Sequence, residues 1–532
     1  MKQTDNFGFK RFGVMLDCSR NAVMKVDTVK RFVDIVSKLG YNELQLYTED
    51  TYTITEYASF GYGRGRYSKE ELREIDKDCI EKGVELVPCV QTLAHLKQIF
   101  RHQDFSNLCD IDSVLNCMMD KTYELIELMI KNISDCFSSK RINLGMDEAN
   151  LGGHGIVFFK NGQVPSKDEY MLNHVEKVKS IADKYGYECS VWYDQFAWAA
   201  FGDNFYNESN LKSKGFVEKF PKDINLIYWD YGGWLKDGCD QSEYINRINC
   251  YRNITPKVHF AGSVERQSDF FTNPEYNNKV LEAQLYACKK AKVDSFLITI
   301  WGDDGVESPW FIGLPSLYYA STIVYPKEFC KKEFLSLTGF DYYIIDELSK
   351  INYSEQDGKL RYIKGLLKTI LYDDILQMNY IHFIGEDTEC KINNAIQKLD
   401  KLNYNSNYVY FKALSVLCKF AKIKIEYSKN VYKEYDDRKM DKSIELLTEM
   451  NVLLKQFEQL YRKQWYIDNK SFGYEIFCIK IGGLIQRNNV AIELLLDYQN
   501  GKIKNIEELD NRNKIKHGFG ASYKDLVTFN IF

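Results

Sequence analysis

Short apolar runs alternate with amphipathic segments over roughly the first 320 residues, and this alternation limits the possible folds more than any other feature. The runs are apolar almost without interruption, as expected for parallel strands buried on both faces. Eight strand-then-helix units in about 310 residues predict an α/β fold, the (β/α)8 or TIM barrel. A doubly wound sheet is the alternative, but it does not need eight strands at this spacing. The predicted strands are 12–16, 43–47, 85–89, 141–145, 188–192, 225–229, 258–262 and 295–301.

The strand pattern fades from about residue 329 onward. Segments such as 441–464 instead place apolar residues at helical spacing with charged residues between them. We therefore expect the barrel in residues 1–328 and a mostly α-helical C-terminal domain in residues 329–532. No Pro-rich linker separates the two, which favours tight packing of the second domain on the barrel.

The composition excludes several classes of function. With 70 basic and 75 acidic residues, the net charge of −5 gives no basic face for nucleic acid. No stretch of about 18 apolar residues predicts a membrane span. The first sixteen residues contain no apolar leader region, and the 14 cysteines show no disulfide framework. We therefore expect a cytoplasmic protein with reduced cysteines, with zinc or redox roles for the cysteines as the alternative.

Polar and aromatic residues gather directly after the predicted strands. Active sites of such barrels lie at the carboxyl ends of the strands, so one topology places these side chains around one mouth. In chain order they are Asp17, Arg20, Glu49, Asp50, Gln91, His95, Asp147, Glu148, Asp194, Asp230, Tyr231 and Asp303.

Asp147 and Glu148 are the candidates for catalysis. An adjacent pair of acids is common by itself, but this pair ends an apolar strand at the mouth of the predicted barrel. Successive side chains of an extended segment point in different directions, so one acid can face a substrate substituent while the other faces the bond to be broken. Crowding two carboxyls also raises one pKa, which suits a general acid. Two acids in a solvated loop remain the alternative.

Together these motifs resemble glycoside hydrolase family 20, the β-N-acetylhexosaminidases. Their order and spacing fit the family across about 300 residues. The segments that carry the resemblance are 12–20 (FGVMLDCSR), 86–95 (LVPCVQTLAH), 142–149 (INLGMDEA) and 300–303 (IWGD). Segments 47–52, 63–67 and 469–473 are similar to motifs of a bacterial branch that lacks the small α/β domain usually found before the barrel.

The resemblance implies an exo-acting enzyme that removes terminal GlcNAc or GalNAc with retention, using the substrate's own acetamido oxygen as nucleophile. Glu148 would protonate the leaving oxygen, and Asp147 would orient the acetamido group. Tyr231, or its rival Tyr193, would support the acetamido oxygen. The resemblance also implies substrate-binding roles for Arg20, Glu49, Asp50, His95, Trp192, Asp194, Trp229, Trp301 and Asp303, and a possible homodimer. We expect no metal and no nucleotide cofactor, because neither HExxH nor a glycine-rich phosphate loop is present.

The chain departs from the family pattern at four places. Phe12 stands where many members carry an arginine that grips ring hydroxyls, so Arg11 or Arg20 would have to replace it. Arg20 could instead form an ion pair with Asp17. Asn143 and Asp303 stand where the family has His and Glu, and segment 262–267 lacks the tryptophans of relatives. These departures leave the chemistry in place but leave the sugar open, so a related glycosidase for sulfated or disaccharide-capped glycans is one alternative. A non-catalytic glycan-binding protein is the other, and the intact Asp147–Glu148 pair argues against it.

Overall fold

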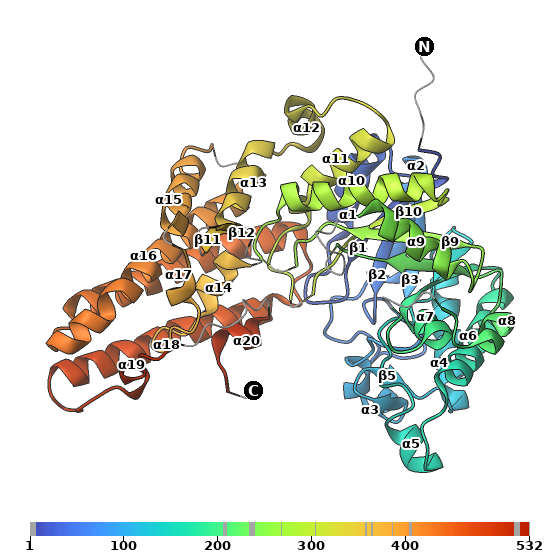
Figure 1. Ribbon diagram of the computed structural model, residues 1–532, viewed down its shortest axis with the longest axis horizontal. Coiled ribbons are helices and arrows are strands. Elements are labelled where there is room, and N and C mark those ends of the chain that lie inside the picture. Colours follow the sequence, from blue (N-terminus) through green and yellow to red (C-terminus); the bar gives the residue numbers. More distant parts are fainter. Residues whose placement is uncertain are drawn as a thin grey trace.

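The computed structural model describes residues 7–205, 210–232, 240–267, 269–303, 305–356, 359–362, 365–385, 387–403, 407–514 and 522–530. Residues 1–6, on which the expectation of a missing leader partly rests, lie outside these ranges. A barrel forms the first part of the chain and long helices form the last (Figure 1). Within these ranges, no helix combines the length and the apolar character that crossing a bilayer requires.

Eight parallel strands close into a barrel in the order β1-β10-β9-β8-β7-β6-β3-β2. Each predicted strand overlaps one of them, so the (β/α)8 prediction is confirmed. The strand predicted over 141–145 stops two residues early, because Gly145 and Met146 have positive φ angles of 71° and 74° and leave the extended region. The strands are β1 (Arg11–Asp17), β2 (Glu43–Thr48), β3 (Glu85–Val90), β6 (Arg141–Asn143), β7 (Glu188–Trp192), β8 (Asn225–Trp229), β9 (Val258–Ser263) and β10 (Ser295–Ile300).

Helices connect successive strands of the barrel and cover its outside. Ser68 and Glu71 form a complete capping box at the start of one of them. The main connecting helices are α1 (Val26–Lys38), α2 (Lys69–Glu81), α4 (Asp120–Ser134), α6 (Lys167–Lys184), α7 (Asp194–Phe201), α9 (Gln241–Tyr251), α10 (Pro274–Lys290) and α11 (Leu314–Val324). Short elements interrupt this pattern after β3 and β6, among them the hairpin β4 (Cys109–Ile111) and β5 (Val114–Leu115), and α5 (Ile156–Asn161).

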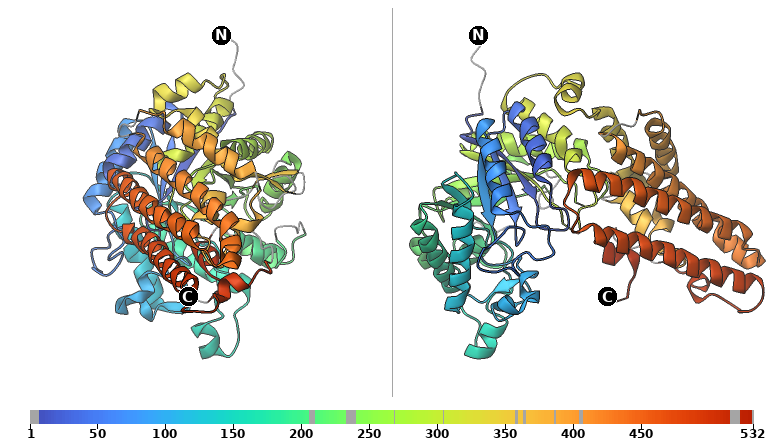
Figure 2. Two further views of the ribbon diagram at one scale, coloured as in Figure 1. Left: turned by 90° about the vertical axis from the view of Figure 1, so that its left-hand side faces the viewer. Right: turned by 180° about the vertical axis from the view of Figure 1, so that it is seen from behind.

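The C-terminal region is mostly helical, as predicted. Three long helices, α16 (Val409–Asp437), α17 (Asp441–Asp468) and α18 (Tyr474–Gln499), pack along one another (Figure 2). The hairpin of β11 (Tyr353–Gln356) and β12 (Lys359–Tyr362) is an exception that the helical pattern did not predict. The boundary between residues 328 and 329 stays a prediction.

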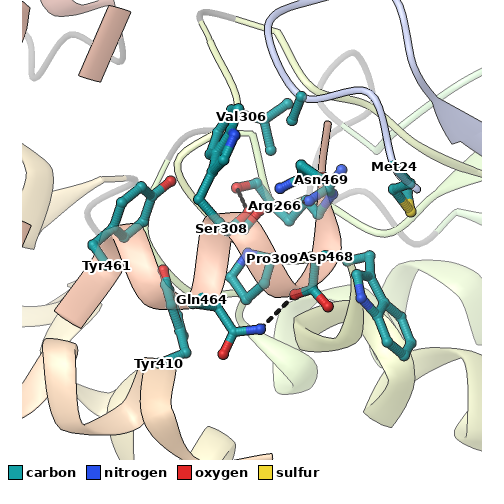
Figure 3. A pocket seen from close by; sticks show the side chains of 13 residues that line it. Met24, Arg266, Val306, Ser308, Pro309, Tyr410, Tyr461, Gln464, Asp468 and Asn469 are labelled. Atoms are coloured by element: carbon teal, nitrogen blue, oxygen red, sulfur yellow. Dashed lines mark hydrogen bonds between the residues drawn. The ribbon is translucent and has the colours of Figure 1, made fainter. Parts of the chain in front are cut away.

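The helical region is anchored on the loop that follows β10. The Glu307 carboxylate in this loop lies 3.2 Å from Lys368 and 2.9 Å from Lys480, and all three side chains are buried. The hydroxyls of Tyr410 and Tyr461 donate to the Glu307 carbonyl at 3.1 and 3.0 Å. Figure 3 shows these tyrosines at a cavity of ≈ 20 Å³ between barrel loops and helices, about enough for one water. The tight packing expected from the missing linker is therefore observed.

Candidate active site

Asp147 and Glu148 lie in a turn directly after β6. Gly145, Met146 and Glu148 all have positive φ, so the segment is not extended as the sequence suggested. A Cβ at Gly145 would lie 2.1 Å from Gln91 Oε1, which explains why glycine stands there. The turn still separates the two acids: the side chain of Asp147 is 12% exposed and that of Glu148 is 57% exposed. Positive φ in non-glycine residues is costly and gathers at functional sites.

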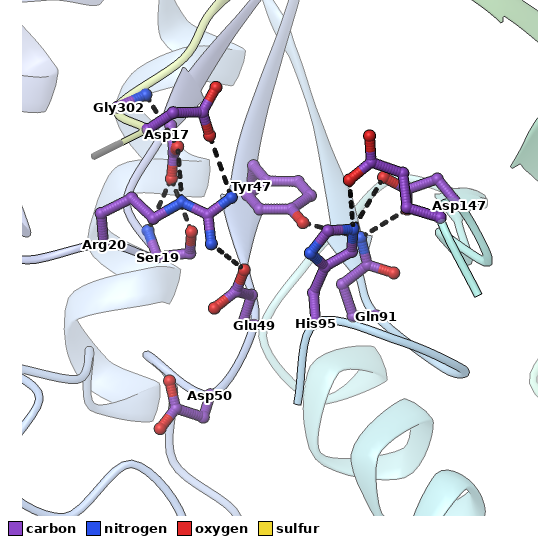
Figure 4. A network of polar contacts seen from close by, with 12 residues as sticks. Asp17, Ser19, Arg20, Tyr47, Glu49, Asp50, Gln91, His95, Asp147 and Gly302 are labelled. Carbon is purple, nitrogen blue, oxygen red and sulfur yellow. Dashed lines mark hydrogen bonds and ion pairs between the residues drawn. The ribbon is translucent and has the colours of Figure 1, made fainter. Parts of the chain in front are cut away.

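His95 and Gln91 hold the Asp147 carboxylate from two sides (Figure 4). His95 Nε2 lies 3.2 Å from Asp147 Oδ2 and 3.5 Å from Glu148 Oε2. Gln91 Nε2 donates to Asp147 Oδ1 at 2.7 Å and lies 2.7 Å from the Tyr47 hydroxyl. Burial alone would raise the pKa of Asp147, but His95 and Gln91 outweigh it and keep this pKa below its usual value. Asp147 is therefore held ionised.

Glu148 has the opposite environment. Burial, and then the neighbouring Asp147 carboxylate, raise the pKa of Glu148 above its usual value. Its backbone N–H donates to Asp194 Oδ2 at 2.8 Å, which fixes the turn from behind. A carboxyl with a lowered pKa beside one with a raised pKa is an arrangement suited to proton donation next to a fixed negative charge.

A pocket of ≈ 230 Å³ opens in front of the two acids. Most of the predicted site residues line it, and the structure adds Tyr47 and Gln267. The lining residues are Arg20, Tyr47, His95, Asp147, Glu148, Trp192, Trp229, Tyr231, Gln267, Trp301 and Asp303. Glu49, Asp50 and Asp194 do not line it, and direct substrate contact stays a prediction for every predicted site residue.

Aromatic rings form much of the pocket wall. Trp229 stacks on Tyr231 with ring centroids 5.4 Å apart, and Trp301 meets the edge of Tyr47 at 4.9 Å. Tyr193, the rival for the acetamido contact, is instead buried against Tyr228 and Tyr251 at 4.9 and 4.7 Å. The structure therefore brings Tyr231 to the pocket, whereas Tyr193 packs in the layer between the barrel strands and their helices.

Arg20 occupies the end of the pocket away from the acids. It donates to Glu49 at 2.8 Å and to Asp303 at 3.0 Å, and lies 3.8 Å from Asp17. Burial outweighs the neighbouring Arg20 guanidinium and raises the pKa of Glu49 to about 7. Phe12 is 1% exposed and stacks on a core tyrosine.

The contacts of Arg11 and Asp50 explain why these two residues lie outside the pocket. Arg11 begins β1 at the opposite end of the barrel and pairs with Glu85 at 3.3 Å, so of these two arginines Arg20 is the one at the mouth. Asp50 lies apart from the Arg20–Glu49 pair (Figure 4) and binds Arg64 Nε at 3.1 Å. Alternation along a strand could have identified Tyr47 as inward-facing. No signal in the sequence singles out Gln267.

His95, Asp147 and Glu148 also have the composition of a metal site. One possible ligand atom from each lies within 4.8 Å of the others. Burial alone would lower the pKa of His95, but Asp147, Glu49 and Glu148 outweigh it and raise this pKa to about 9. A metal ligand must be the neutral imidazole, so the protonated ring opposes metal binding at neutral pH.

The raised pKa of His95 predicts a pH-dependent contribution to stability. Its value of about 9 lies above the usual 6.5, so the stabilisation is fully present below pH 6.5 and is lost as pH rises through 9. We expect up to about 3 kcal/mol of unfolding free energy to disappear over this window. Urea unfolding of wild type and His95→Asn at several pH values measures it. Parallel curves for the two proteins would contradict the assignment.

Two family models match the chain: "Glycosyl hydrolase family 20, catalytic domain" over residues 9–213 and "Glycoside Hydrolase 20C C-terminal domain" over residues 341–524. Hexosaminidase D of Bos taurus is 22% identical over 223 residues, 41% of this chain and 62% of that protein. Hexosaminidase D of Homo sapiens is 25% identical over 220 residues, which cover 40% of this chain and 43% of that protein. The match thus spans less than two thirds of either relative. The structure of Flavobacterium johnsoniae chitobiase has a TM-score of 0.47 and 14% identity over 86% of this chain and 78% of that one.

Proposed function

The chain belongs to glycoside hydrolase family 20, and from this premise we propose that it is an exo-β-N-acetylhexosaminidase that releases terminal β-linked GlcNAc or GalNAc. The observation that carries the proposal is the Asp147–Glu148 pair, one acid held ionised by His95 and the other with a raised pKa, at the wall of one pocket. A volume of ≈ 230 Å³, ended by Arg20 and Asp303, suits one sugar residue better than a chain and favours exo action.

The proposed mechanism needs no carboxylate nucleophile. Glu148 protonates the leaving oxygen while the acetamido oxygen of the substrate attacks the anomeric carbon, and the deprotonated Glu148 then activates water. Asp147 stabilises the positive charge that develops on the acetamido nitrogen, and the Tyr231 hydroxyl supports the acetamido oxygen. Trp192 and Trp229 enclose the acetyl methyl. The remaining pocket tryptophan, Trp301, lies under the sugar ring.

Hydrolysis of p-nitrophenyl β-GlcNAc, β-GalNAc and β-glucoside tests the proposal directly. We expect turnover of the two acetamido sugars alone, because a β-glucoside lacks the internal nucleophile. Cleavage of the glucoside at a comparable rate would contradict substrate assistance. If none of the three is cleaved, sulfated and disaccharide-capped glycosides come next, and binding of glycans without turnover would favour a non-catalytic role.

Location, assembly and origin are part of the proposal. All thirteen cysteines that the structure describes are free thiols, which supports a reducing, cytoplasmic location that cell fractionation would check. The homodimer is proposed from the family resemblance. A monomeric mass by light scattering at micromolar concentration would refute the dimer. A bacterial origin follows from the motifs shared with the bacterial branch, and sequencing of the source genome would check it.

A further inference from the structure

A glycine- and arginine-rich loop, residues 61–66, lies behind Arg20 and has no part in the mechanism above. We propose that Arg64 of this loop is a positioning residue: it fixes the backbone that presents Arg20 to the sugar, and the helical region holds the loop against that backbone. The inference rests on the proposed function, because it assigns Arg20 to the far hydroxyls of the sugar.

The contacts of Arg64 converge on the residue it is proposed to position. Its Nη1 donates to the carbonyl of Arg20 at 2.7 Å, and its Nη2 donates to the carbonyl of Ser19. Its Nε donates to Asp50 Oδ1 at 3.1 Å, and this carboxylate is 3% exposed. Arg64 is therefore bound on three sides, and two of its acceptors are the peptide groups that carry the Arg20 side chain.

Gly61 lets the loop approach the end of β2. A Cβ at Gly61 would lie 2.1 Å from the carbonyl oxygen of Asp50, and φ there is +68°. Gly65 is favoured by its φ of +70°, and a Cβ there would be in ordinary contact with Lys470 and Phe472 of the helical region at 3.5 Å. A bulkier residue at Gly61 would push the loop, and Arg64 with it, away from the end of β2.

The turn between α17 and α18, residues 469–473, holds the same assembly from the other side. Lys470 Nζ donates to the carbonyl of Arg66 at 2.9 Å, and Lys470 N donates to Val23 O at 2.8 Å. Gly473 has φ +92°, and a Cβ there would lie 1.8 Å from Asn21 O. The turn thus contacts both the glycine loop and the segment just after Arg20. Segments 63–67 and 469–473, far apart in the sequence, meet at this point.

These contacts fix the position of the Arg20 guanidinium in the pocket. Its guanidinium is shared between Glu49 at 2.8 Å and Asp303 at 3.0 Å, so a small backbone shift disturbs both pairs at the far end of the pocket. Glu148 lies at the other end, on a turn fixed by Asp194. Loss of Arg64 should therefore weaken sugar binding far more than proton transfer, and raise KM more than it lowers kcat.

Steady-state kinetics of Arg64→Gln, Arg64→Lys and Arg66→Gln test this prediction. We expect kcat/KM of Arg64→Gln to fall roughly 10- to 100-fold, the range for lost hydrogen bonds to a charged group, with most of the loss in KM. Arg64→Lys keeps the positive charge but loses the forked N–H donors of the guanidinium. Its kcat/KM should lie between those of wild type and Arg64→Gln. Arg66 is the matched control: it lies in the same loop, but its side chain donates to the carbonyls of Ala58 and Phe60, and its variant should stay within about twofold.

A double-mutant cycle with Arg20→Gln separates positioning from general stability. If Arg64 acts through Arg20, adding Arg64→Gln to Arg20→Gln should change kcat/KM little further. The same fold loss in both backgrounds would overturn the inference, and so would Arg64→Gln kinetics equal to those of Arg66→Gln. If Arg64→Gln does not fold, the cycle is run with Arg64→Lys. Wild type that cleaves no acetamido glycoside would overturn the proposed function and this inference with it.

Discussion

Replacing Glu148 with Gln is expected to lower kcat for p-nitrophenyl β-GlcNAc by about 10²- to 10⁴-fold, the contribution of a positioned general acid–base. The amide has nearly the same shape but neither donates a proton to the leaving oxygen nor accepts one from water. The raised pKa of Glu148 extends the pH range in which the carboxyl carries a proton to donate. The amide of Gln has no such proton. Steady-state kinetics at one pH measure the loss.

The leaving group provides the control for Glu148→Gln. With a 2,4-dinitrophenyl glycoside, the dinitrophenolate leaves with little need for protonation. The loss of kcat caused by Glu148→Gln should therefore be smaller on that substrate. Thermal unfolding should change little, because the Glu148 side chain is 57% exposed and its ion-pair contact, among the residues that the structure describes, is the one with His95 at 3.5 Å. An equal deficit on both substrates would contradict a proton-donor role in bond cleavage.

The barrel could be predicted because its strands are buried on both faces and therefore read as unbroken apolar runs. Residues 109–115 and 156–161 could not be predicted in the same way, since two- and three-residue strands and a six-residue helix are too short to show a periodic pattern. The end of β6 was misplaced for a different reason. Met146 adopts a positive φ that its residue type disfavours, and its N–H donates to Gln91 Oε1 at 3.3 Å, a tertiary contact that no local sequence pattern shows.

Topology placed the candidate residues around one mouth but could not say which side chains face it. Asp50 and Glu49 are neighbours at the end of β2, yet Glu49 turns to Arg20 while Asp50 turns to Arg64. The position of a residue after a strand predicts which end of the barrel it occupies, but not which way its side chain points. Its direction depends on partners from distant segments, such as Arg64.

Replacing Asp147 with Asn is expected to lower kcat by about 10²- to 10³-fold, as for the removal of one preorganised stabilising group. His95 and Gln91 hold this carboxylate ionised, so its charge is already in place when the acetamido nitrogen becomes positive. The neutral amide keeps the shape and loses the charge. Asp147 contributes most to the raised pKa of His95, so the pKa of His95 should be lower in Asp147→Asn than in wild type.

Inhibitor binding distinguishes this role from a merely structural one. A thiazoline that mimics the cyclised acetamido intermediate should lose affinity for Asp147→Asn by a factor similar to the loss in kcat, whereas GlcNAc should lose much less. Equal losses for both ligands would mean that Asp147 only shapes the pocket. Mass spectrometry of wild type treated with a 2-fluoro sugar completes the argument: with no carboxylate nucleophile, no adduct should form, and a stable glycosyl-enzyme on Asp147 would replace substrate assistance with a covalent mechanism.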